Sequence, residues 1–162
     1  MRKSPRSEMA MHPQQLIHLP NASTCIAVCA ASGARCWCSE SAHADWLLVK
    51  EIRHESGTQH EAEFSSDKPG RSFDRFGGGR HAMEPESSGR KQALRSFVRQ
   101  LADFLDRAIA ARQFRYLVLI AEPKVLGMLR DSLSATTKKS VVCEAPKNLA
   151  NLDVSEIRKY FA

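Results

Sequence analysis

Three short apolar segments in the first third of the chain predict β-strands. Residues 24–31, TCIAVCAA, form a continuous run of small apolar side chains, which is typical of a central strand covered on both faces. Ser32 and Gly33 mark a turn, and a second strand is expected over residues 34–40. A third strand is expected over residues 45–54, because its apolar WLLV segment gives way to alternating charge. The pattern therefore predicts a three-stranded meander.

Helical and strand-like patterns alternate in the second half of the chain. Apolar side chains at helical spacing, with charges on the opposite face, predict an amphipathic helix over residues 91–112. Residues 115–121, RYLVLIA, predict another buried strand, and Pro123 suits the first position of a following helix. Residues 140–146, SVVCEAP, predict a fifth strand. A capping-box spacing at residues 153–156 predicts a short terminal helix.

The order of these elements predicts the fold class. Three strands, a long loop and then alternating helices and strands make the first, fourth and fifth strands parallel neighbours, because helical crossovers join them. The second and third strands then extend the sheet in the antiparallel sense. We expect an α/β protein with a ribonuclease H-like three-layer sandwich, a five-stranded mixed sheet in the order 3-2-1-4-5 and about three helices.

Length and composition favour one globular domain with an extension. The chain has 162 residues, of which 43% are hydrophobic and 26% are charged, as is ordinary for a folded domain with a real core. Residues 1–21 contain three prolines and no periodicity, so we expect a flexible N-terminal extension there. Residues 22–162 are expected to form a single α/β domain.

Charge and cysteine usage bear on partners and compartment. The formal net charge of +6 permits a polyanionic partner such as RNA, but a charge of this size is also common in proteins that bind no nucleic acid. The five cysteines fit small buried residues in a reducing compartment better than a disulfide scaffold or a metal site. No segment approaches the apolar length of a membrane span. We therefore expect a cytoplasmic protein, although export is not excluded.

A long loop over residues 55–90 carries the most distinctive segment of the chain. Its core, SDKPGRSFDRFGGGRHAMEP at residues 66–85, holds half of the eight glycines. Adjacent glycines favour a main chain that adopts positive φ or lies against a partner. The basic side chains around them are ready donors to an anion. The candidate binding residues of this loop are Arg71, Arg75, Gly77, Gly78, Gly79, Arg80 and His81, and Lys68 is a secondary candidate.

Two interpretations of this loop remain open. It is either a functional arm that contacts phosphates or a protein partner, or a solvated loop whose arginines pair with its own carboxylates. A general-base role for His81 lacks a serine, cysteine or carboxylate placed by sequence to complete a triad. No catalytic residue, metal ligand or cofactor is predicted.

Four further residues are secondary candidates for binding. Glu122 and Lys124 follow a predicted parallel strand, at the sheet edge where open α/β proteins commonly bind ligands. A helix start is the stronger interpretation of that pair. Ser32 and Arg35 belong to the turn that follows the first strand, where a simple hairpin connection is also the stronger interpretation.

Several segments of the chain resemble the bacterial host attachment protein family. These segments are CAASGARCWC, the glycine-rich loop, FVRQLADFLDRA, YLVLIAEPKVLGMLR and KKSVVCEAPKNLANLDVSEIRKYF. The resemblance extends from about Cys25 to Phe161. The family name implies a role in the attachment of bacteria to host cells.

A more distant similarity is to the middle domain of archaeal and eukaryotic peptide-chain release factors. That resemblance implies the same α/β layout, with a glycine-rich loop between the third strand and the long helix. Release factors carry Gly-Gly-Gln in that loop, and the glutamine serves peptidyl-tRNA hydrolysis. Here Gly78, Gly79 and Arg80 occupy the comparable place, so the glutamine is absent.

Three functional hypotheses follow from the sequence. The first is a non-enzymatic protein that contacts the ribosome, tRNA or another RNA through its basic glycine-rich loop. The second is a protein of host-cell attachment, acting with a surface factor or indirectly. The third and weakest is a peptidyl-tRNA or other ester hydrolase, against which the missing glutamine and missing triad both count.

Overall fold

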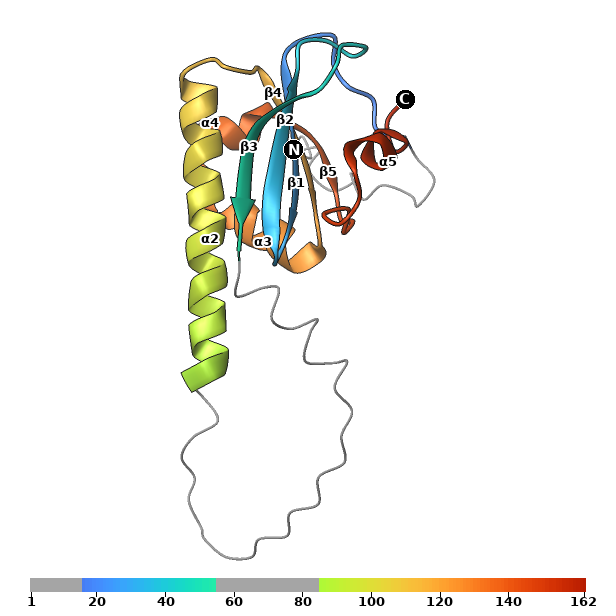
Figure 1. The fold of residues 1–162 in the computed structure, drawn as a ribbon. Coiled ribbons are helices and arrows are strands. Elements are labelled where there is room, and N and C mark those ends of the chain that lie inside the picture. Colours follow the sequence, from blue (N-terminus) through green and yellow to red (C-terminus); the bar gives the residue numbers. More distant parts are fainter. Residues whose placement is uncertain (1–15, 55–84) are drawn as a thin grey trace, which may run out of the picture.

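The computed structural model describes residues 16–54 and 85–162, which form one mixed sheet with helices on it (Figure 1). The strands are β1 Thr24–Ala30, β2 Gly33–Ser39, β3 Leu47–Arg53, β4 Tyr116–Ala121 and β5 Val141–Ala145. The helices are α2 Pro85–Ala110, α3 Pro123–Ser132, α4 Ala135–Ser140 and α5 Val154–Arg158.

The five strands lie in the order β3-β2-β1-β4-β5, as the sequence predicted. β1 pairs in parallel with β4, and β4 pairs in parallel with β5, because helices connect them. β2 is antiparallel to both β1 and β3, so the first three strands form the expected meander. The α/β class and the strand order are therefore confirmed.

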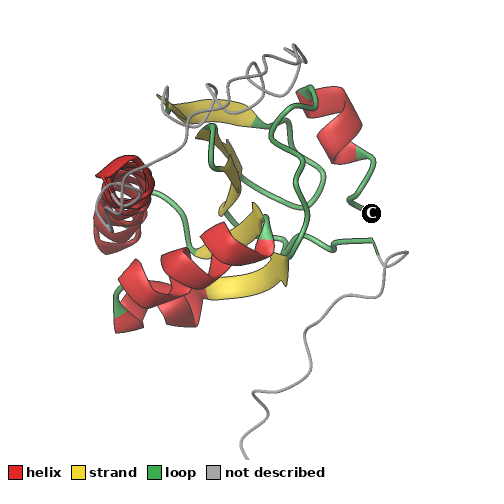
Figure 2. Cartoon of the chain, turned by 90° about the horizontal axis from the view of Figure 1, so that it is seen from below, coloured by secondary structure: helices red, strands yellow, loops and turns green. Residues whose placement is uncertain are grey.

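A separate apolar cluster covers each face of the sheet. On one face, α2 and α3 pack over alternate residues of the central strands, including Cys25, Ala27 and Leu119. On the other face, Ile157 of α5 packs with Ile26 and Val118. The view along the strands shows α5 on the side of the sheet opposite to α2 and α3 (Figure 2).

Within the described residues, no helix has the length and apolar character needed to cross a membrane.

The helices differ from the prediction in number and in one boundary. The described residues contain four helices rather than about three, because the short helix α4 precedes β5. Its six residues are too few to show an apolar period, and its N-cap is Ser134, whose hydroxyl accepts a bond from the Thr137 amide at 3.2 Å. Helix α2 begins at Pro85, so the predicted loop over residues 55–90 ends earlier than expected.

The last residues assigned to the N-terminal extension pack on the domain. Ile17 is 3% exposed and forms a parallel bridge with Phe161. Its amide donates to the Tyr160 carbonyl at 2.8 Å, and its carbonyl accepts from the Ala162 amide at 3.0 Å. The boundary predicted at residue 21 is therefore too late, because one buried apolar side chain gave no periodic signal in the sequence. Residues 1–15 lie outside the described residues.

The β1–β2 turn depends on Gly33. Gly33 has φ of 153°, and a Cβ atom there would lie 2.4 Å from the main-chain oxygen of Ile52 in β3. That distance is far below van der Waals contact, and the obstacle is the backbone of the edge strand β3. No side chain can therefore be added at residue 33 without moving β3 away from β2.

We predict that Gly33→Ala lowers the free energy of unfolding by more than about 2 kcal/mol, because it forces two strands apart. Urea denaturation followed by circular dichroism measures this change. The matched control is Gly127→Ala inside α3, where an added Cβ meets nothing within 4 Å. That substitution should stabilise the protein by about 0.5–1 kcal/mol. Equal effects of the two substitutions would contradict the steric argument.

Candidate functional site

The residues predicted to form the binding loop lie outside the described part of the chain. Lys68, Arg71, Arg75, Gly77, Gly78, Gly79, Arg80 and His81 all fall between His54, the last described residue after β3, and Pro85, the first residue of α2. The structure describes β3, which precedes the loop, and α2, which follows it. These two elements carry the described residues that adjoin the loop in the chain.

His54 fixes the point at which the chain leaves the sheet. Its Nδ1 donates to the Ala31 carbonyl at 2.7 Å, and its ring stacks on Phe97 of α2 with centroids 5.2 Å apart. The His54 amide also donates to the Ser32 carbonyl at 2.9 Å. These contacts connect the end of β3 to the β1–β2 turn and to α2. Nε2 of His54 is buried and has no hydrogen-bond partner in the structure as described.

Three of the secondary candidates lie at one edge of the sheet. Ser32 follows β1 and Glu122 follows β4, and these strands are parallel neighbours with Cys29 opposite Ala121. Glu122 is the N-cap residue of α3, but its side chain caps no amide. Lys124, in the first turn of α3, is exposed. Ser32 and Glu122 thus follow the ends of two neighbouring strands, and the structure gives them the roles of a turn residue and a helix start.

Arg35, the fourth secondary candidate, has a structural environment. Its Nη2 donates to the carbonyls of Ala150 at 2.8 Å and of Leu152 at 2.5 Å. Its guanidinium also lies 5.0 Å from the centre of the Trp37 ring. A small cavity of about 100 Å³ adjoins it, with Arg53 and Ala150 in its wall. Arg35 therefore holds the C-terminal segment against β2.

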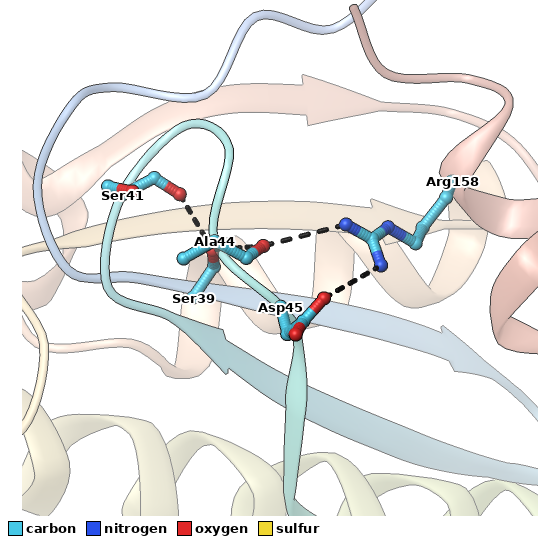
Figure 3. A network of polar contacts seen from close by, with 5 residues as sticks. All are labelled: Ser39, Ser41, Ala44, Asp45 and Arg158. Atoms are coloured by element: carbon cyan, nitrogen blue, oxygen red, sulfur yellow. Dashed lines mark hydrogen bonds and ion pairs between the residues drawn. The ribbon is translucent and has the colours of Figure 1, made fainter.

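A second arginine fixes the C-terminal helix to the β2–β3 connection (Figure 3). Nη1 of Arg158 lies 3.8 Å from a carboxylate oxygen of Asp45, and Nη2 donates to the Ala44 carbonyl at 3.5 Å. The same guanidinium lies 5.5 Å from the centre of the Trp46 ring. Within the β2–β3 connection, the Ser39 hydroxyl donates to the Ser41 carbonyl at 2.7 Å. This network joins the C-terminal helix to the β2–β3 connection and stabilises the fold.

The first half of α2 carries cationic side chains without such partners. Lys91, Arg95 and Arg99 are exposed and spaced by four residues, so they lie along one side of the helix, each about 6 Å from the next. Among the described residues, none of the three forms an ion pair or a hydrogen bond. We call these three residues the basic ridge. The sequence showed charges on the outer face of this helix, but the ridge was not among the predicted site residues.

A groove between α2 and α3 adjoins the basic ridge. Its volume is about 570 Å³, and it is lined by Arg95, Arg99, Asp103, Met128, Asp131 and Ser132. The sequence analysis missed this groove because α3 contributes half of its wall. A four-residue spacing of arginines could have indicated the α2 side, but no periodic signal indicates which face of α3 lies opposite.

The cysteines pack as apolar residues. Cys25, Cys29 and Cys36 are fully buried beneath α2, and all five thiols of the chain are free. A side-chain hydrogen bond with Cys36, together with burial, raises the pKa of Cys25 well above its ordinary value. Burial does the same to the pKa of Cys29. Within the described ranges, no three histidine, cysteine or carboxylate side chains gather in a way that could hold a metal ion.

Comparison with known protein families shows to which family this chain belongs. The family described as "Protein required for attachment to host cells" matches residues 25–161, which include every strand except the first residue of β1. The chain belongs to this host attachment family. The resemblance inferred from the sequence segments is thereby confirmed.

One similar member of the curated proteins comes from Rickettsia prowazekii (strain Madrid E). The chain is 32% identical over 79 residues to "Uncharacterized protein RP470" of that organism, which covers 48% of this chain. The matched part is 53% of the Rickettsia protein, so the chain spans about half the length of this relative. The name of the Rickettsia protein states no activity, so this relative assigns no function to the family.

We predict that Arg35→Met lowers the free energy of unfolding by about 1–2 kcal/mol, because two carbonyls lose a charged donor. The control is Arg53→Met, whose side chain is 84% exposed and contacts Glu51 at 3.6 Å. That substitution should change stability by less than about 0.5 kcal/mol. Urea midpoints of both variants test the comparison, and an unchanged midpoint for Arg35→Met would exclude its anchoring role.

Proposed function

We propose that this member of the host attachment family is a non-enzymatic RNA-binding protein. The observation that supports the proposal is the basic ridge of Lys91, Arg95 and Arg99, which is exposed and unpaired among the described residues. Exposed arginines and lysines in a row bind the phosphates of a nucleic acid and release its counterions. The ridge thus offers a sequence-independent contact to an RNA backbone.

The position of the ridge links it to the predicted binding loop. Helix α2 begins at Pro85, directly after the segment that contains Arg71, Arg75 and Arg80, and Lys91 lies within its first two turns. Loop and ridge are therefore consecutive in the chain, and both carry cationic side chains. We infer that an RNA contacted by the ridge also meets the loop.

The proposed partner is a structured RNA of the translation apparatus, either the ribosome or tRNA. We choose it on the resemblance to release factors inferred from the sequence, with which the strand order 3-2-1-4-5 is compatible. The same order, with both faces of the sheet covered, supports a ribonuclease H-like three-layer assignment. We place the protein in the cytoplasm, where its free thiols would stay reduced.

We predict that replacing both Arg95 and Arg99 by alanine weakens RNA binding and lowers its salt dependence. Each lost phosphate contact reduces the slope of log affinity against log salt by about 0.7 for a single strand, so the double variant should lose about 1.4. Fluorescence anisotropy of a labelled RNA at several salt concentrations measures the slope. A second variant, Arg75→Ala with Arg80→Ala, tests the loop in the same assay.

The control removes the same amount of charge elsewhere. Lys138 and Lys139 are exposed on α4, away from the ridge, and their replacement by alanine should leave the slope nearly unchanged. Equal effects of the ridge and control variants would mean that net charge alone attracts RNA. Absence of RNA binding by the unaltered protein at low salt would refute the proposed function.

A second candidate function is the attachment of bacteria to host cells, and the description of the family supports it. Direct adhesion requires the protein at the cell surface, whereas an RNA-binding protein acts inside the cell. Fractionation of cells with the native-level protein separates the two. Surface exposure with no ribosomal association would favour attachment over RNA binding.

A further inference from the structure

The α2–α3 groove has two cationic and two anionic side chains in its wall. Arg95, Arg99 and Asp103 line it from α2, and Met128, Asp131 and Ser132 line it from α3. Its volume of about 570 Å³ lies within the range of small-ligand sites. The arginines can bind an anionic group of a ligand, and the carboxylates can accept from its hydrogen-bond donors.

No ion pair closes this groove. Arg95, Arg99 and Asp131 are all exposed, and among the described residues no contact within 4.0 Å joins an arginine of α2 to the carboxylate of α3. An ion pair between these arginine and aspartate side chains would fill the groove. The space between them therefore stays open to a ligand, while Met128 is half-buried and offers an apolar surface.

The hydrogen-bonding groups on α3 match one nucleobase. An ionised carboxylate provides two adjacent acceptors, and the neighbouring serine hydroxyl provides a donor. Among the four RNA bases, only guanine presents two adjacent donors, N1–H and N2–H, next to an acceptor, O6, on its Watson–Crick edge. Asp131 can accept both N–H groups, and Ser132 can donate to O6. Unpaired bases of single-stranded RNA are read through this edge.

We propose that the groove binds one unstacked guanosine nucleotide of a single-stranded RNA. Asp131 and Ser132 read the base edge, Met128 packs against the base, and Arg95 and Arg99 hold the flanking phosphates. Asp103, at the end of the α2 wall, accepts a hydrogen bond from the ribose 2′-hydroxyl. This inference rests on the proposed RNA-binding function and adds a base preference to it.

The test uses short fluorescent uridine oligomers that carry one central guanosine or one central adenosine. We expect the unaltered full-length protein to bind the guanosine oligomer about tenfold more tightly, which is typical of one bidentate base contact. Asp131→Asn should abolish this preference, because an amide offers one acceptor and one donor in place of two acceptors. Binding of the adenosine oligomer should persist in that variant, since the arginines are intact.

The matched control is Glu40→Gln. Glu40 is exposed just after β2, and its substitution changes the net charge by the same amount as Asp131→Asn. The control should keep the guanosine preference of the unaltered protein. Because Asp131 is exposed near the end of α3, both variants should also keep the circular dichroism spectrum of the folded protein.

The outcomes separate this inference from the proposed function. Equal binding of the two oligomers by the unaltered protein, with normal salt dependence, would overturn the guanosine site and leave RNA binding intact. A preference that persists in Asp131→Asn would place the base elsewhere and would overturn the inference as well. Displacement of both oligomers by equal concentrations of polyglutamate would show that the surface binds any polyanion, and this would overturn the guanosine site. Failure of every oligomer to bind would refute both proposals.

Discussion

The parallel pairing of β1 with β4 is the contact on which the rest of the fold depends. Every residue of β1 is buried, and so is every residue of β4 after Tyr116. A strand pair that is apolar on both faces is stable only when a layer covers each face. Helices α2 and α3 supply one layer, and α5 with Ile17 and Phe161 supplies the other.

This requirement explains why the two ends of the described chain meet. The second face needs apolar cover, and α5 has only five residues, of which Ile157 is buried. Ile17 and Phe161 complete the cover from opposite ends of the chain, joined by a parallel bridge. The capping box of Asp153 and Glu156 lets so short a helix begin at a defined residue. Arg35 and Arg158 then attach this layer to β2 and to the β2–β3 connection.

The sequence predicted the sheet well because each strand has its own local signal. The continuous apolar runs of β1 and β4 and the proline at the start of α3 are properties of adjacent residues. Helix α4 and the packing of Ile17 escaped prediction because they depend on partners distant in the sequence. For the same reason the α2–α3 groove was missed, since neither helix alone defines it. The predicted loop residues fall outside the described ranges and stay predictions.

Two sets of cationic side chains in the described chain differ in their partners, and this difference supports the functional proposal. Arg35, Arg130 and Arg158 bind carbonyls or carboxylates of the protein itself, so their charges are used by the fold. Lys91, Arg95 and Arg99 have no such partner within the described residues, although carboxylates of α2 and α3 lie in the same region. A net charge of +6 alone would not distinguish a binding protein from an ordinary basic one. The proposed function rests on the ridge instead, because cations without a protein partner can exchange water for phosphate without breaking a contact that the fold requires.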